Sequence, residues 1–106
     1  MLKEISADEL KRKIDEAQDF RLIEVLDPEK YDEWHLPGAE NIPLDDLGPA
    51  AGIKFKQDEE IVVYCASLEC KASARASRKL DEMGYNVLEY SGGKKEWKEK
   101  GYPMER

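Results

Sequence analysis

The sequence has 106 residues, 41% of them hydrophobic, and a net charge of -7 at neutral pH. This length predicts one domain, residues 1–106, with its own hydrophobic core. The acidic excess argues against nucleic acid or an anionic membrane as the main partner, because both would repel it. No apolar run reaches the roughly 20 residues that span a bilayer, and the N-terminus lacks the apolar core of a signal peptide. We therefore predict a cytoplasmic protein, where two cysteines are reactive rather than structural.

The first segment predicts a short strand and a capped helix. Leu2–Ile5 fits a strand, and Ser6 with Glu9 forms a capping box, in which a hydroxyl and a carboxylate bond the first backbone N–H groups. The expected apolar side of this helix consists of Leu10, Ile14 and Ala17.

The next segment predicts a strand at Leu22–Leu26, which Glu24 interrupts, and a short helix that begins at Asp27-Pro28. Asn41–Leu44 fits a brief strand before Pro43 limits its pairing. Asp45–Gln57 contains two glycines and a proline, so we expect a loop with at most one helical turn.

The central unit places a thiol between a buried strand and a helix. Ile61–Tyr64 is an unbroken apolar run that Cys65 follows, and a helix is expected from about Lys71 to Gly84. Its predicted apolar face consists of Ala72, Ala76, Leu80 and Met83. Ligands of open α/β sheets bind beyond the carboxyl ends of the strands. The N–H groups and dipole at a helix start favour a thiolate, so we predict a lowered pKa for Cys65.

The last segment predicts a strand at Tyr85–Tyr90, a glycine turn, and a short helix at Lys94–Lys100. Trp97 is its expected apolar anchor, and the rest is interpreted as a solvated face. The alternation of strands and helices predicts an α/β fold with a mostly parallel sheet and helices on both faces.

Five segments, in order and at similar spacing, resemble the rhodanese-like domain in its single-domain form. They are HLPGAENIPL (His35–Leu44), VYC (Val63–Cys65), GYNV (Gly84–Val87), SGGKKEW (Ser91–Trp97) and GYP (Gly101–Pro103). The resemblance covers nearly the whole chain and implies a five-stranded, mostly parallel sheet flanked by helices. It also implies sulfur transfer through a persulfide on Cys65, from thiosulfate or a persulfide donor to a thiol or cyanide acceptor, without a metal or organic cofactor.

The loop after Cys65 is expected to bind the donor and to stabilise the thiolate and persulfide through its backbone N–H groups. Its residues are Ala66, Ser67, Leu68, Glu69, Cys70, Lys71, Ala72 and Ser73. Many active members of the family have C-x-x-G-x-R here, but Leu68 replaces the glycine and the loop is longer, which predicts a differently shaped pocket. Glu69 adds a negative charge, so we expect thiosulfate to be a poorer donor than a less charged persulfide. Elsewhere, Glu24, Leu26 and Trp34 also differ from the residues that the family often has, and we interpret those changes as structural.

Two alternatives to a sulfurtransferase stay open. A binding or regulatory module would keep the fold with little turnover. In a thiol redox protein, Cys70 would form a disulfide with Cys65, although Cys70 also suits a small apolar residue of the loop. Oxyanion chemistry of the C-x5-R type is a minor alternative, because Lys71 is only a point charge and Arg75 lies further along the helix.

The expected partners are a small sulfur donor and a thiol acceptor, which includes a thiol-bearing protein, and we expect a monomer. His35 is the only histidine and cannot build a zinc site alone. Its position before Leu36-Pro37-Gly38 indicates that it fixes a turn.

Overall fold

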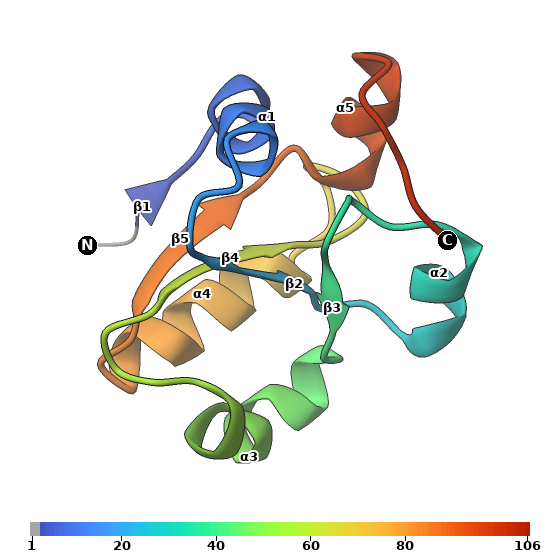
Figure 1. Cartoon of the computed structure of the whole chain (residues 1–106). Coiled ribbons are helices and arrows are strands. Elements are labelled where there is room, and N and C mark those ends of the chain that lie inside the picture. The colour runs from blue at the N-terminus through green and yellow to red at the C-terminus, as the bar shows by residue number, and fades with distance from the viewer. Residues whose placement is uncertain (1–2) are drawn as a thin grey trace.

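The computed structural model describes residues 3–106, in which five strands form one parallel sheet in the order β1-β5-β4-β2-β3 (Figure 1). The strands are β1 (Lys3–Glu4), β2 (Arg21–Glu24), β3 (Glu40–Asn41), β4 (Glu60–Tyr64) and β5 (Asn86–Tyr90). The helices are α1 (Ala7–Asp15), α2 (Pro28–Glu33), α3 (Leu44–Lys54), α4 (Ala72–Glu82) and α5 (Gly93–Glu99). The predicted five-stranded parallel α/β architecture is therefore confirmed.

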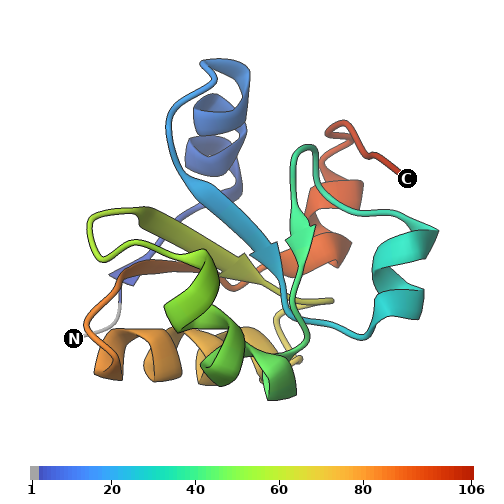
Figure 2. The ribbon, with the colours of Figure 1, turned by 60° about the horizontal axis from the view of Figure 1, so that its bottom comes forward.

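Helices cover both faces of this sheet. Figures 1 and 2 show α1 and α5 on one face and α3 and α4 on the other, with α2 beside the β3 edge. Within residues 3–106, no helix combines the length and apolar character that a membrane crossing requires.

The central strand β4 is buried on both faces, as its unbroken apolar run predicts. Ile61 and Val63 pack into the apolar cluster beneath α3 and α4, whereas Val62 and Tyr64 pack into the cluster beneath α1 and α5. This alternation of two sides along a strand continues to Cys65, which therefore faces α4.

The local signals at helix ends are confirmed. The Ser6 hydroxyl accepts a hydrogen bond from the Glu9 N–H at 3.1 Å, and the Glu9 carboxylate accepts one from the Ser6 N–H at 3.2 Å. Pro28 opens α2, and Gly84 follows α4 with a φ of +90°, a conformation that glycine adopts without strain.

Two residues assigned to apolar helix faces were predicted wrongly. Ala17 lies beyond the end of α1, and Met83 at the end of α4 is 40% exposed. Apart from the predicted strand Asn41–Leu44 and the segment Asp45–Gln57, strand and helix limits differ from the predicted ones by one or two residues. Leu2, the predicted start of the first strand, lies outside the described residues.

The expected loop at Asp45–Gln57 was wrong, because this segment folds into α3. Leu47 and Ala51, one helical turn apart, are both fully buried against the sheet and α4, and this packing outweighs the weak helix propensity of glycine and proline. The preceding strand is also shorter than predicted and ends at Asn41, before Pro43, which has no N–H to donate.

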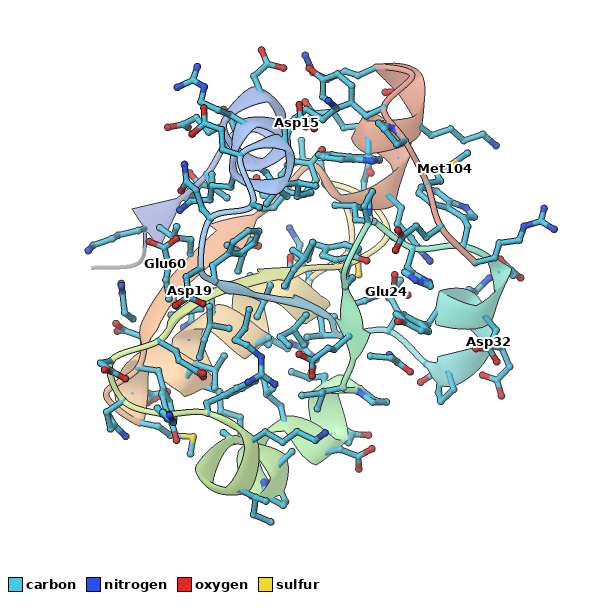
Figure 3. The ribbon with its side chains drawn as sticks, in the orientation of Figure 1. Asp15, Asp19, Glu24, Asp32, Glu60 and Met104 are labelled. Atoms are coloured by element: carbon cyan, nitrogen blue, oxygen red, sulfur yellow. The ribbon has the colours of Figure 1, made fainter. Side chains whose placement is uncertain are left out.

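Lys94 corrects the prediction that the final helix is solvated apart from Trp97, because the Lys94 side chain is buried. Its ammonium group lies 3.1 Å from Oε2 of the fully buried Glu24 and donates a hydrogen bond to the Lys30 carbonyl oxygen at 2.7 Å. The Tyr64 hydroxyl donates to the other Glu24 oxygen at 2.9 Å. Figure 3 shows Glu24 inside the molecule, whereas Asp32 lies on the outer side of α2. Burial raises the pKa of Glu24, against the opposing effects of Lys94 and Tyr64.

The substitution Glu24→Gln tests this pKa. A carboxyl group with a raised folded-state pKa contributes stability that is complete below its unfolded-state pKa of 4.5 and is lost as the pH rises through the folded-state value. We therefore expect the free energy of unfolding of the wild type to fall, relative to that of Glu24→Gln, as the pH rises from 4.5 towards neutrality. Urea unfolding of both proteins measures this difference. A wild-type advantage that grows with pH would contradict it and show that Lys94 outweighs burial.

Candidate active site

Cys65 lies at the carboxyl end of β4, where the sequence predicts the reactive thiol. Its side chain is fully buried and faces the start of α4. The thiol is therefore closed to solvent in this structure.

Ser73, in the first turn of α4, is the polar side chain next to this thiol. Its hydroxyl oxygen lies 3.4 Å from Sγ of Cys65 and donates its proton to Oε2 of Glu89 at 2.7 Å. Cys65 follows β4, Ser73 lies in α4 and Glu89 in β5. The buried Ser73 hydroxyl therefore lies between the Cys65 thiol and the Glu89 carboxylate.

The pKa of the Cys65 thiol is raised, so the prediction of a lowered value was wrong. Burial is the main cause and the neighbouring Cys70 thiol adds to it, whereas the hydroxyl and the N–H of Ser73 lower the pKa. The start of α4 does act on the sulfur as expected, but loss of water around the buried thiol outweighs it.

The start of the loop is held by the first turn of α5. The N–H of Lys94 donates to the Cys65 carbonyl oxygen at 3.0 Å, and the N–H of Lys95 donates to that of Ala66 at 2.8 Å. Gly93 packs directly against the same backbone: a Cβ there would lie 2.5 Å from the Cys65 oxygen. These contacts fix the backbone at Cys65 and Ala66, where the loop begins.

The predicted loop residues follow Cys65 directly, and four of the eight are exposed to solvent. The exposed ones are Ala66, Leu68, Glu69 and Lys71. Within the loop, the Cys70 N–H donates to the Ser67 carbonyl oxygen at 3.1 Å and closes a turn. The Cys70 carbonyl oxygen then lies 3.5 Å from Sγ of Cys65. The backbone therefore brings Cys70 against the candidate nucleophile.

Glu69 lies on the outer side of this loop. It is fully exposed, and its own N–H, the Ser67 hydroxyl and Lys95 lower the pKa of its carboxyl group. With Leu68, which is 67% exposed, it lines a groove of about 610 Å³ that runs past the β5–α5 turn to the start of α1. Cys65 does not line this groove.

Two other candidates lie away from the thiol. His35 donates from Nδ1 to the Tyr31 carbonyl oxygen at 3.1 Å and stacks on the Tyr31 ring, so it fixes the end of α2, as its position in the sequence indicates. Arg75 is exposed on α4. Within residues 3–106, no group of three or more His, Cys, Asp or Glu side chains is arranged to hold a metal ion.

Sequence reasoning missed Glu89 and Gly93. The two-residue alternation along Tyr85–Tyr90 gives the signal for Glu89, since it places this residue on the same face as the buried Val87. Nothing local in the sequence reveals that Gly93 contacts Cys65.

Removal of the Ser73 hydroxyl should raise the pKa of Cys65 further. In Ser73→Ala we expect alkylation of Cys65 near neutral pH to be several-fold slower, because the hydroxyl lowers this pKa. The pH dependence of alkylation, followed by peptide mass mapping, measures the effect. Ser77→Ala is the matched control, because Ser77 is buried on the same helix and donates to the Ala74 carbonyl oxygen instead. Equal profiles for the two variants would contradict the assigned contact.

Gly93→Ala should destabilise the protein more than Gly101→Ala. Both glycines have positive φ, at +67° and +72°, which costs an alanine about 1–2 kcal/mol. Only at Gly93 does the new Cβ also meet backbone, whereas nothing lies within 4 Å at Gly101. Urea unfolding of both variants separates the two effects. If both lose the same stability, Gly93 does not hold the loop by close packing.

Comparison with known proteins places this site in a family. The family described as rhodanese-like domain matches residues 6–100. YtwF of Bacillus subtilis, a putative sulfurtransferase, is 32% identical over 96 residues, which cover 91% of this chain and 90% of YtwF. The thiosulfate sulfurtransferase PspE of Escherichia coli is 38% identical over 76 residues, or 70% of each chain.

Further curated relatives are longer than this chain, and a solved structure gives the same assignment. The chain spans 39% and 50% of the length of two further curated relatives. The solution structure of the rhodanese-like domain of Alr3790 from Anabaena sp. has 30% identity and a TM-score of 0.87, and the match covers 99% of this chain and 80% of that one. The fold, the position of the thiol and these matches lead to one conclusion: the chain belongs to the rhodanese-like family.

Proposed function

We propose that the protein is a rhodanese-type sulfurtransferase in which Cys65 carries the transferred sulfur as a persulfide. The observation that carries this proposal is the position of Cys65 at the carboxyl end of the central strand, in contact with the hydroxyl of Ser73. Membership of the family and the sulfurtransferase names of YtwF and PspE support it.

The chemistry needs only groups of the chain. The Cys65 thiolate attacks the sulfane sulfur of the donor and forms a persulfide. The bond between that sulfur and the rest of the donor breaks, and sulfite (from thiosulfate) or a thiolate (from a thiol persulfide) leaves with its electron pair. The Ser73 N–H stabilises the negative sulfur, and the Ser73 hydroxyl does so once its proton turns from Glu89 to Sγ of Cys65. A thiol or cyanide acceptor then takes the outer sulfur. No metal or organic cofactor takes part in the proposed reaction.

The donor would enter along the exposed side of the loop. Glu69 carries a full negative charge there, although Lys95 nearby offsets part of it. We therefore propose that a thiol persulfide is a better donor than the dianion thiosulfate, and that the acceptor is a small thiol or a thiol-bearing protein. A reducing compartment, the cytoplasm, suits this chemistry and the two free cysteines.

Intact-mass analysis after incubation with thiosulfate or a thiol persulfide tests the proposal. Because external thiols remove a persulfide, the excess donor is first separated from the protein. We expect the donor to add one sulfur atom to Cys70→Ser, which keeps Cys65 as its only thiol, and none to Cys65→Ser,Cys70→Ser. The rate should increase with pH, because the raised pKa leaves little thiolate at neutrality. Equal sulfur on both proteins, or none on either with any donor, would contradict Cys65 as the carrier.

A binding or regulatory module is the second candidate, and the full burial of Cys65 favours it. The same assay at alkaline pH separates the two functions. A sulfurtransferase gains sulfur once the thiol ionises. A binding module gains none at any pH, although its free thiol can still be alkylated after unfolding.

A further inference from the structure

Cys70 lies in contact with Cys65, and its role as a loop residue does not require this contact. It is partly buried against the same apolar cluster as Cys65, and its carbonyl oxygen lies 3.5 Å from Sγ of Cys65. The Cys70 N–H donates to the Ser67 carbonyl oxygen at 3.1 Å and closes a turn, which folds the loop back over the Cys65 thiol. The more accessible of the two sulfurs is therefore that of Cys70.

Backbone N–H groups from both ends of the loop also lower the pKa of the Cys70 thiol. They come from Ala66, directly after Cys65, and from Ala72, the first residue of α4. Burial alone would raise the pKa of Cys70, but these bonds and the interaction with the Cys65 thiol outweigh it and lower the pKa. The loop thus surrounds a second nucleophile in the place where its N–H groups would hold a donor.

We propose a further activity: Cys70 attacks the persulfide on Cys65, forms an internal disulfide and releases hydrosulfide. This inference rests on the proposed function, because that function supplies the persulfide. With this step, and a dithiol that reduces the disulfide, the protein acts as a reductase of sulfane sulfur. This activity adds to the transfer of sulfur from Cys65 to an acceptor.

The step balances within the chain. The Cys70 sulfur bonds to Sγ of Cys65, and the bond between that Sγ and the outer sulfur breaks. The outer sulfur leaves with the electron pair of this bond and takes the Cys70 proton, so it departs as hydrosulfide. The two cysteine sulfurs are oxidised together by two electrons, and the outer sulfur is reduced by two. A dithiol of the cell is the reductant that would restore both thiols.

A single-turnover experiment without oxygen or added thiol tests this inference. The reduced protein is incubated with thiosulfate, or with a thiol persulfide that is then removed, and protein mass and released sulfide are both measured. We expect the wild type to lose the mass of two hydrogen atoms and to release one sulfide per chain. Cys70→Ser should instead gain the mass of one sulfur atom and release almost no sulfide. Cys70→Ala is a second variant, in case serine disturbs the loop, and circular dichroism checks that each variant is folded.

The outcomes separate this inference from the proposed function. If the wild type keeps a stable persulfide, as Cys70→Ser does, or if both release sulfide equally, Cys70 does not resolve the persulfide although Cys65 still carries sulfur. If neither Cys70 variant gains sulfur and the wild type forms no disulfide, the proposed function fails and this inference fails with it.

Discussion

The buried ion pair between Lys94 and Glu24 is the interaction on which the site depends. The Lys94 side chain joins α5 to β2 through Glu24 and to the first turn of α2 through the Lys30 carbonyl, while its backbone N–H donates to the Cys65 carbonyl. One residue therefore fixes both the layers of the fold and the start of the reactive loop. Loss of one partner of a buried pair generally costs about 3–5 kcal/mol, because the other charge stays buried and unpaired.

This arrangement gives the site a rigid base and a movable cover. Gly93 and Lys94 hold the Cys65 backbone, and β4 is paired on both sides. The loop beyond Cys65 is mostly exposed, and its turn between Ser67 and Cys70 rests on one backbone bond. Because the covered thiol has a raised pKa, opening the loop would both admit the donor and restore water around the sulfur, which favours the thiolate. Access and activation are thus coupled in one movement.

The sequence allowed the prediction of the fold class and of the position of Cys65 at the end of the central strand, because both depend on local patterns. An apolar run that ends in cysteine before a helix is visible in the chain, as is the capping box at Ser6. By contrast, α3 forms because Leu47 and Ala51 find a sheet to pack on, and no local propensity shows this. The burial of Lys94 and the pKa of Cys65 depend in the same way on contacts between distant segments. The N–H groups and dipole at the start of the helix therefore predicted the wrong direction for the shift in the pKa of Cys65.

The central claim is that sulfur is carried on Cys65 within a loop whose base stays fixed. A crystal structure of the Cys70→Ser protein after exposure to thiosulfate or a thiol persulfide tests this claim most directly, because that variant lacks the second thiol. The account predicts one extra sulfur atom bonded to Sγ of Cys65, an unchanged contact between Lys94 and the Cys65 carbonyl, and displacement confined to residues 66–72. An unmodified Cys65, or a loaded Cys65 with Gly93 and Lys94 moved away from it, would contradict the account.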